Sequence, residues 1–320
     1  MSAKTILQIK NLDISFRTNA GVVHAIRGIN LDLQKGETVA IVGESGSGKS
    51  VTMKAAVGLL DSNATINSGE ILYTYDNGHG QDKTVDLLKL SKKQLRTEYN
   101  GQRLAMVFQD PMASLNPRKK VGDIISEGMD IHHHFANRQE REEKISEMLK
   151  KVGLSPEHAA RYPHQFSGGQ RQRIGIARAL IMNPKLIIAD ECISALDVSI
   201  QAQVVNLMKD IQAETQCAYL FIAHDLSMVK YISDRIGVLH LGYMVESGTK
   251  EEIFSHPIHP YAKSLLSAIP HPNPVVEKHR VALTYNYATS GIDYAKGTEH
   301  SVGGTHTVLA TDEEFDAWTK

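Results

Sequence analysis

The sequence is poor in the features that mark secreted, membrane-spanning and disulfide-bonded proteins. Its only two cysteines, Cys192 and Cys217, stand in apolar or near-apolar surroundings and form no C-x-x-C pair. That pattern excludes a disulfide framework and a cysteine metal knuckle, and it favours a reducing cytosol. The N-terminus has no long apolar stretch and no run of about eighteen apolar residues occurs, so we expect neither secretion nor a membrane span. Any association with a membrane is then expected to come through a partner.

An excess of charge of one sign is also missing. Lys and Arg together number 35 and Asp and Glu 36, which gives a formal net charge of −1. This balance argues against a general nucleic-acid binder, and we expect no nucleic acid among the partners. The 320 residues, of which 42% are hydrophobic, allow a large core and two domains, or one domain with substantial additions.

Residues 38–50, TVAIVGESGSGKS, carry the most specific pattern. The apolar run 38–42 is typical of a strand buried on both faces of a parallel sheet. Residues 43–50 fit the pattern G-x-x-x-x-G-K-[ST] of a phosphate-binding loop, whose main-chain N–H groups and following helix hold a polyphosphate. Lys49 is expected to neutralise the β- and γ-phosphates, and Ser50 to ligate Mg²⁺. We assign ATP binding to Gly43, Glu44, Ser45, Gly46, Ser47, Gly48, Lys49, Ser50 and Val51.

Polar residues follow three other apolar strands. Residues 103–108 are followed by Gln109, residues 186–190 end in Asp190 with Glu191 next, and residues 218–223 are followed by His224. The carboxyl ends of parallel strands meet at the edge where open α/β sheets bind ligands. We expect Gln109 to reach a metal or water, Asp190 to hold Mg²⁺ and Glu191 to polarise the attacking water. His224 is expected to contact the γ-phosphate.

A second helix that begins with glycine residues is predicted to start within residues 162–173, YPHQFSGGQRQR. Ser167 is a favourable N-cap for a helix that begins at Gly168 and Gly169, with Gln170 beside them, and continues to residue 182. The uncovered N–H groups at such an end form another anion site. Because the phosphate loop already provides one, we expect two chains to meet across a shared nucleotide.

The remaining segments are predicted from periodicity and turn residues. They are strands at 6–16, 22–33 and 68–73, a helix at 49–60, a loop without helix at 110–117, charged helices at 123–129 and 138–152, a last helix at 262–269, and an appended, β-rich or partly extended segment at 275–320. The run His132–His134 is interpreted as a solvated loop rather than a metal site, because adjacent residues do not converge on one ion. Phe16 is either a base-stacking aromatic or an ordinary core residue.

These features, in this order and spacing, resemble the nucleotide-binding subunit of ABC transporters over about residues 6–250. The resemblance implies that two subunits enclose two ATP molecules, each between one chain's residues 43–50 and the other chain's residues 167–170. It also implies roles for single residues: Phe16 stacks on the base, Gln109 couples the site to the transporter and ligates Mg²⁺, Glu191 is the catalytic carboxylate, His224 is the switch histidine and Asp197 is the D-loop residue.

The stretches GESGSGKSVT, FQDPMASLNP, YPHQFSGGQRQR, ALDVSIQAQ and HPIHPYAKSLLSAIP look more narrowly like the D-type ATPase subunit of bacterial oligopeptide and dipeptide importers. Two departures matter. Cys192 and Ile193 stand where most family members have Pro-Thr, which alters loop rigidity rather than the reacting groups, so we expect hydrolysis to be retained. No cysteine follows Cys217, which excludes the iron–sulfur cluster that many relatives carry.

The resemblance implies an α/β fold of the P-loop ABC type. It would have a RecA-like core with an antiparallel β-layer at residues 1–110 and 184–255, an inserted helical subdomain at 111–183 and a C-terminal extension at 256–320. The expected cofactors are ATP and Mg²⁺. The expected partners are a second, homologous ATPase subunit, two membrane permeases and an extracellular peptide-binding protein, with this chain at the cytoplasmic face of the membrane.

Three alternatives to peptide import remain at this stage. One is an ABC ATPase for another substrate, such as nickel or an exported compound. Another is a soluble ABC protein acting on ribosomes or DNA, although the chain has a single phosphate loop and no sustained heptads. The third is a nucleotide-binding regulatory subunit with little hydrolysis, although Glu191 and residues 167–170 are retained.

Overall fold

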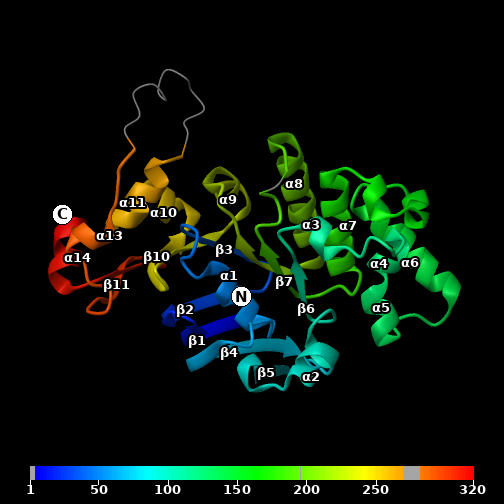
Figure 1. Cartoon of the computed structure of the whole chain (residues 1–320), viewed down its shortest axis with the longest axis horizontal. Helices are drawn as coiled ribbons and strands as arrows, with labels where there is room; N and C mark the ends of the chain where they lie inside the picture. Colours follow the sequence, from blue (N-terminus) through cyan, green and yellow to red (C-terminus); the bar gives the residue numbers. More distant parts are fainter. Residues whose placement is uncertain (1–3, 195, 270–281) are drawn as a thin grey trace.

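Two β-sheets form the frame of the structure, a computed structural model that describes residues 4–194, 196–269 and 282–320. In Figure 1 the smaller sheet lies below the larger one, and helices gather at both ends of the larger sheet. This architecture confirms the predicted α/β fold, with an antiparallel layer beside a parallel core.

The smaller sheet is antiparallel, with strand order β2-β1-β4-β5. Its strands are β1 (Thr5–Thr18), β2 (Gly21–Gln34), β4 (Ala64–Asp76) and β5 (Asp82–Asp86). The strands predicted at 6–16 and 22–33 are confirmed. The strand predicted at 68–73 is longer, because β4 pairs with β1 from Tyr73 opposite Leu7 to Ala64 opposite Phe16.

The larger sheet has the order β11-β12-β10-β9-β3-β8-β7-β6. Its strands are β3 (Thr38–Val42), β6 (Leu104–Val107), β7 (Leu186–Asp190), β8 (Ala218–Ile222), β9 (Arg235–His240), β10 (Tyr243–Thr249), β11 (Thr298–Gly303) and β12 (His306–Ala310). Neighbours from β9 to β6 run parallel, whereas β9, β10, β12 and β11 pair antiparallel. The carboxyl ends of the parallel strands therefore share one edge.

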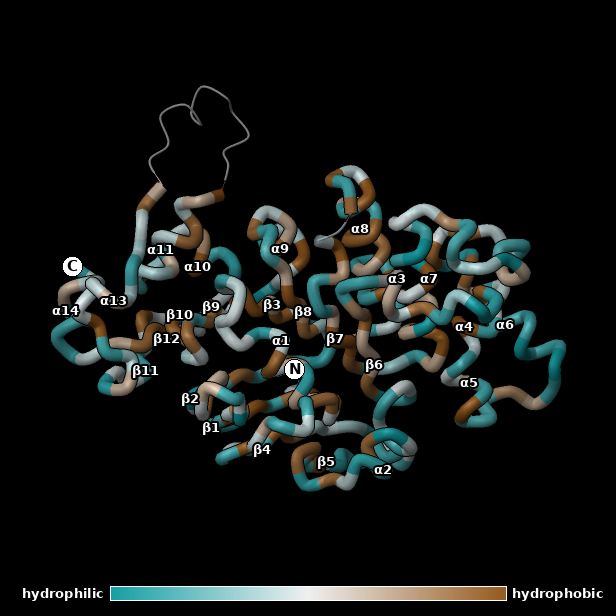
Figure 2. The backbone as a smooth tube through the Cα atoms, in the orientation of Figure 1, coloured by the Kyte–Doolittle hydropathy of each residue, from teal (hydrophilic) through white to brown (hydrophobic). Residues whose placement is uncertain are grey.

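The parallel strands are buried on both faces, as the apolar runs predict. All five residues of β3, β7 and β8 are buried. Consecutive side chains enter different cores: Val39 and Ile41 pack in the core that includes the antiparallel sheet, and Ala40 and Val42 pack in the core that includes the helices. In Figure 2 the hydrophobic segments accordingly converge on the middle of the molecule.

The helices that lie between β6 and β7 in the sequence gather at one end of the larger sheet, at the right in Figure 1. They are α3 (Pro111–Ser114), α4 (Val121–Ile125), α5 (Glu127–His132), α6 (Arg138–Lys151) and α7 (Gly168–Leu180), with 3-10 turns at Pro156–Ala160 and Pro163–Gln165. The other helices before residue 240 are α1 (Lys49–Ala56), α2 (Lys92–Gln94), α8 (Val198–Thr215) and α9 (Leu226–Ile232). A 3-10 turn at Leu87–Lys89 precedes α2, and a short π-helix at Leu95–Tyr99 follows it.

Three of the predicted helix boundaries are wrong. Helix α1 ends at Ala56 rather than residue 60, before the left-handed Gly58. The segment 110–117 contains the one-turn helix α3, because Asp110 accepts a hydrogen bond from the Ala113 N–H and Pro111 occupies a favourable first position. The helix predicted at 123–129 is two helices that meet at the buried Ser126.

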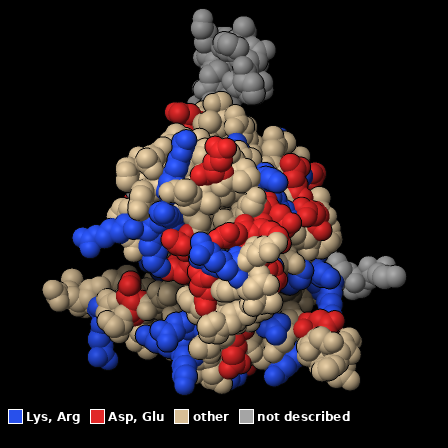
Figure 3. Space-filling view, turned by 90° about the vertical axis from the view of Figure 1, so that its right-hand side faces the viewer, with Lys and Arg blue, Asp and Glu red and all other residues tan. Residues whose placement is uncertain are grey.

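Charged side chains of both signs cover the end of the molecule that carries these helices (Figure 3). On α6, Arg141 pairs with Asp130 and Asp123, and Arg138 pairs with Glu142 one turn away. His132 ends α5 with its Nδ1 at 2.6 Å from the Gln102 side-chain nitrogen. Across the described ranges no cluster of three His, Cys, Asp or Glu side chains could hold a metal ion, and no helix is long and apolar enough to span a bilayer.

The C-terminal region continues the larger sheet rather than standing apart from it. It contains α10 (Lys250–Ser255), α11 (Pro260–Ser267), α13 (Tyr287–Ser290) and α14 (Asp312–Thr319) together with β11 and β12. The prediction that the helix at 262–269 is the last one is therefore wrong. Of the segment predicted as β-rich, residues 275–281 lie outside the described residues, and β12 pairs with β10.

A buried carboxylate joins this region to the core. Glu246 of β10, fully enclosed, accepts hydrogen bonds from the N–H groups of Ile258 at 2.8 Å and His259 at 2.9 Å. Its Oε1 also lies 2.7 Å from Nε2 of His306 in β12. His259 in turn caps α11 by accepting the Tyr261 N–H on Nδ1 at 3.0 Å. One side chain thus fixes the start of α11 and the outer hairpin.

We predict that replacing His259 weakens the dependence of stability on acid pH. Burial, with smaller contributions from the neighbouring His240 and Lys263, lowers the pKa of His259 from 6.5 to about 3. The unfolded chain therefore binds a proton between pH 6.5 and 3 that the folded chain does not, so stability falls as the pH drops through this window. In H259N, where Asn still accepts the capping bond, about 2 kcal/mol of the loss between pH 7.5 and pH 5 should disappear.

Urea unfolding at the two pH values measures this difference. The matched control is H79N in the exposed turn between β4 and β5, which should keep the wild-type loss. Equal losses in H259N and H79N would contradict the assignment of this pH dependence to His259.

Candidate nucleotide-binding and catalytic site

The loop between β3 and α1 is shaped by glycines that no other residue can replace. A Cβ on Gly43, at φ +147°, would lie 2.1 Å from the Leu239 carbonyl oxygen. A Cβ on Gly48, at φ +110°, would lie 2.5 Å from Cδ1 of Ile26. The loop therefore packs against β9 on one side and β2 on the other, and its residues Glu44, Ser45 and Gly46 face solvent.

Two buried polar groups of this loop are poorly satisfied by the described residues: Lys49 bonds neutral carbonyl groups, and the Ser47 hydroxyl makes no hydrogen bond. The ammonium group of Lys49, almost fully buried, donates only to the carbonyl oxygens of Gly43 and Glu44, each at 2.8 Å. Burial lowers its pKa. The Ser47 hydroxyl is buried and has no hydrogen-bond partner among the residues that the structure describes. Both features fit a loop that surrounds an anion, and a polyphosphate matches its curvature and charge.

Ser50 and Asp190 meet beside the loop. The Ser50 hydroxyl, at the start of α1, donates to Oδ1 of Asp190 at the end of β7, with a distance of 3.1 Å. Burial raises the pKa of Asp190, and the charge of Glu191 raises it further. A cation would relieve this cost, and hydroxyl and carboxylate oxygens are ligands that suit Mg²⁺. The residues present therefore fit the expected metal.

Glu191 stands between two of the other predicted residues. Its Oε2 accepts a hydrogen bond from Nε2 of Gln109 at 2.7 Å, and its Oε1 lies 2.5 Å from Nε2 of His224. The backbone of Glu191 is left-handed, with φ +46°, and its N–H donates to the Ile222 carbonyl of β8. Such a conformation is unfavourable for a non-glycine residue and aims the carboxylate out of the strand.

The two residues that depart from the family pattern lie in the core. Cys192 and Ile193 are both buried, and Ser194 closes the turn by donating its N–H and its hydroxyl to the Glu191 carbonyl, at 3.1 and 2.9 Å. Burial raises the pKa of Cys192 to about 12, which keeps it a neutral thiol. Packing and hydrogen bonds hold this turn where most family members have proline.

The residues predicted to act across a subunit boundary lie elsewhere on the chain. Ser167 caps α7 and exchanges hydrogen bonds with Gln170, and the exposed Ser167 and Gly168 leave this helix end open. Gly169 packs on α8, where a Cβ would lie 2.5 Å from Cγ2 of Ile200. Within the described chain, no hydrogen bond or ion pair joins residues 167–170 to residues 43–50.

Three further predicted residues lie outside the hydrogen-bonded group around Glu191. Asp197 is exposed at the start of α8, and of its loop Ala195 lies outside the described residues. Phe16 of β1 is partly buried against the core of the antiparallel sheet, and Val51 is half-buried in the first turn of α1.

Sequence reasoning missed one residue that touches the loop. The hydroxyl of Tyr261 in α11 accepts a hydrogen bond from the Glu44 N–H at 2.9 Å, across 217 positions of sequence. Tyr261 belongs to the segment HPIHPY, which the sequence singles out without assigning it a role. Only the fold brings this segment to the phosphate loop.

Comparison with known proteins agrees with this geometry. The family model described as "ABC transporter" matches residues 26–194, and the model "Oligopeptide/dipeptide transporter, C-terminal region" matches residues 245–289. The oligopeptide transport ATP-binding protein OppF of Bacillus subtilis (strain 168) is 50% identical over 98% of this chain and 99% of its own. The dipeptide transport ATP-binding protein DppF of Lactococcus lactis subsp. cremoris (strain MG1363) is 49% identical over 99% of this chain and 97% of its own.

Among solved structures, a dimeric, post-hydrolysis ATP-binding cassette, MJ0796 bound to ADP and Pi, has a TM-score of 0.66. Its sequence is 26% identical to this chain, and the match covers 99% of the MJ0796 chain and 77% of this chain. These two curated relatives carry F-type names, OppF and DppF, so the predicted importer family is confirmed while the D-type label finds no support in their names. The chain belongs to the ABC transporter family, among the ATP-binding proteins of oligopeptide and dipeptide transporters.

Proposed function

We propose that this ATPase powers the import of dipeptides and oligopeptides, as one of two ATPase subunits on a pair of membrane permeases. The observation that carries the proposal is the convergence of Lys49, Ser50, Gln109, Asp190 and Glu191 at one edge of the parallel sheet. The substrate class, dipeptides and oligopeptides, comes from the names of two relatives that are 50% and 49% identical to this chain.

Each of these side chains has a separate role in binding or hydrolysing ATP. The loop N–H groups and Lys49 bind the β- and γ-phosphates, for which the ammonium group exchanges its present carbonyl partners. Ser50, Asp190 and Gln109 would hold Mg²⁺, which when bound neutralises charge on the phosphate oxygens. Glu191 orients and polarises the attacking water, and His224 contacts the γ-phosphate. Phe16 stacks on the base.

A second ATPase subunit completes the site. The open end of α7 offers the N–H groups of Gly168 and Gly169, since those of Ser167 and Gln170 bond within the cap. Among the described residues, none of residues 167–170 bonds the loop at residues 43–50. We therefore place them, with Asp197, against the nucleotide of a homologous, non-identical subunit. The MJ0796 cassette was solved as a dimer with ADP and Pi, which supports this arrangement.

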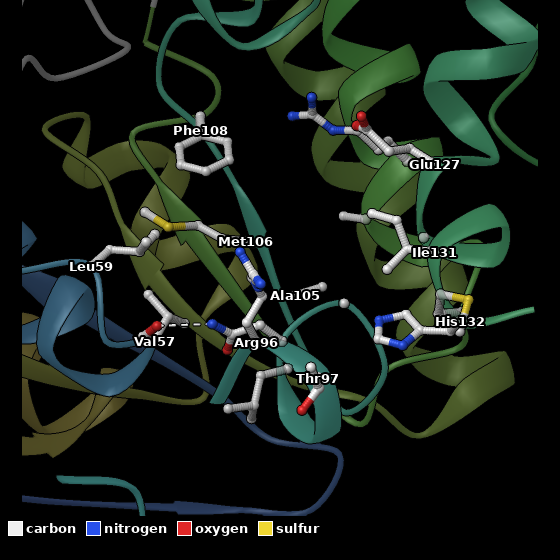
Figure 4. A pocket seen from close by; sticks show the side chains of 17 residues that line it. Val57, Leu59, Arg96, Thr97, Ala105, Met106, Phe108, Glu127, Ile131 and His132 are labelled. Atoms are coloured by element: carbon white, nitrogen blue, oxygen red, sulfur yellow. Dashed lines mark hydrogen bonds between the residues drawn. The ribbon is translucent and has the colours of Figure 1, made fainter. Parts of the chain in front are cut away.

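An apolar pocket between the ATP-binding core and the helical end fits a permease segment. It has a volume of about 640 Å³ and lies among the strand β6, the loop after α1 and the helices α5 and α7. Figure 4 shows Leu59, Met106 and Phe108 on one side of it and Ile131 on the other. Leu59 is 48% exposed and Ile131 65% exposed, and with Met106 and Phe108 they line one apolar pocket, the kind of surface that partners cover.

The position of this pocket suggests how hydrolysis moves a permease. Phe108 lines the pocket, and the next residue is Gln109, which bonds Glu191. The catalytic site and the pocket wall are therefore adjacent in the chain. We assign residues 1–110 and 184–255 to the ATP-binding core, 111–183 to the helical subdomain and 256–320 to the C-terminal extension. Closure of the ATPase pair would shift the helical subdomain against the core and change the pocket between them. The chain would then lie peripherally, at the cytoplasmic face of the membrane.

Replacing the carboxylate of Glu191 should stop hydrolysis while nucleotide still binds. In E191Q the amide keeps the size of the side chain and loses the basic oxygen, so we expect ATP turnover at this subunit's site to fall at least about 100-fold. The measurement is phosphate release by the reconstituted transporter whose partner ATPase also has its catalytic carboxylate replaced. D210N, an exposed site on α8, is the control. Unchanged turnover in E191Q would support a regulatory subunit instead.

A charge at the rim of the apolar pocket should uncouple the chain from the permeases. In I131D a carboxylate would have to be buried on docking, which should weaken assembly at least about tenfold. Binding of Mg-ATP to the chain alone should stay unchanged. Copurification with the permeases measures assembly, and L283D, at a side chain 54% exposed in the C-terminal region, is the control. Assembly of I131D at the level of L283D would rule out the pocket as the docking site.

A further inference from the structure

The backbone of Glu44 is held on both sides of its Cα. Its N–H donates to the Tyr261 hydroxyl at 2.9 Å, and its carbonyl oxygen accepts the Lys49 ammonium at 2.8 Å and the Ser47 N–H at 3.2 Å. Tyr261 is the only one of these three partners that lies outside the loop. The first turn of the phosphate loop is thus anchored to α11 of the C-terminal region.

The N–H and the carbonyl group of Glu44 should respond differently to nucleotide. The Lys49 ammonium has to turn from the loop carbonyls toward the phosphates when a polyphosphate binds, because it is the cation of the loop. The Glu44 carbonyl then loses its strongest partner. The bonds from Ser47 and to Tyr261 remain, so the share of Tyr261 in holding this turn increases when the site is filled.

Tyr261 is itself held rigidly. Its ring stacks on His240 of β9 with centroids 3.9 Å apart and planes at 19°. Nδ1 of His240 lies 2.7 Å from the Tyr294 hydroxyl oxygen, in the segment before β11. Burial raises the pKa of Tyr261 to about 12 and lowers the pKa of His240 to about 4, so both rings are neutral near pH 7. A buried, stacked ring keeps its hydroxyl oxygen at a fixed place beside the loop.

We propose that Tyr261 is a positioning residue for the phosphate loop, through which the C-terminal region supports the binding of nucleoside di- and triphosphates. The inference rests on the proposed function, in which residues 43–50 bind the phosphates. Tyr261 keeps the Glu44 backbone in place while Lys49 binds the phosphates. Tyr261 contacts the loop rather than the nucleotide and takes no part in the chemistry.

The test compares Y261F with Y285F in the full chain by calorimetric titration with Mg-ADP and with AMP, which lacks the β-phosphate. Tyr285 belongs to the same aromatic group, and its hydroxyl bonds Tyr294 and Ser290 rather than the loop. Loss of one hydrogen bond should weaken Mg-ADP binding about three- to tenfold in Y261F. Y285F should bind Mg-ADP like the wild type, and neither variant should change AMP binding comparably.

The ratio of ADP to AMP affinity in one sample separates positioning from lost stability, since a smaller folded fraction lowers both. A wild-type ratio in Y261F would overturn the proposal, and so would an equal change in Y261F and Y285F. K49A tests the underlying site: if K49A still binds Mg-ADP like the wild type, the proposed phosphate loop itself is wrong. If K49A loses binding and Y261F does not, only the role of Tyr261 fails.

Discussion

Burial of the parallel strands on both faces is the constraint on which the rest of this structure depends. Val39 to Val42 alternate between two cores, so this part of β3 carries apolar side chains on both faces. Polar groups are therefore confined to the strand ends, and parallel strands end at the same edge. That geometry places Asp190, Glu191 and His224 beside the loop that follows β3, although they come from distant parts of the sequence.

The site gathered at this edge is costly in the absence of ligand. Lys49 is buried with only carbonyl partners, Asp190 has a raised pKa, the Ser47 hydroxyl is unpartnered and Glu191 has a left-handed backbone. Each of these costs is of the kind that a polyphosphate and a divalent cation would offset. The hydrogen bond from Gln109 and the close contact with His224 occupy the carboxylate of Glu191, which we propose as the catalytic group.

The C-terminal region contributes to this site by packing. Glu246, enclosed beneath α11, fixes the turn from which Tyr261 reaches the loop. The hairpin of β11 and β12 extends the sheet that carries the phosphate loop, and Tyr294 before it supports His240 under Tyr261. The region therefore belongs mechanically to the nucleotide-binding half of the molecule.

Local sequence determined the strands and the groups that we propose to react. Apolar runs of five residues predict β3, β7 and β8, the glycines and Lys49 predict the loop, and Asp190-Glu191 and Gln109 follow their strands directly. The extent of α1, the short helix α3 and the break at Ser126 were predicted wrongly, because capping and a buried hydroxyl network depend on neighbours that periodicity does not describe. Only the tertiary structure brought Tyr261 to Glu44 and kept residues 167–170 away from the loop. Those relations depend on how distant elements pack, and a linear pattern contains no distance between segments 217 positions apart.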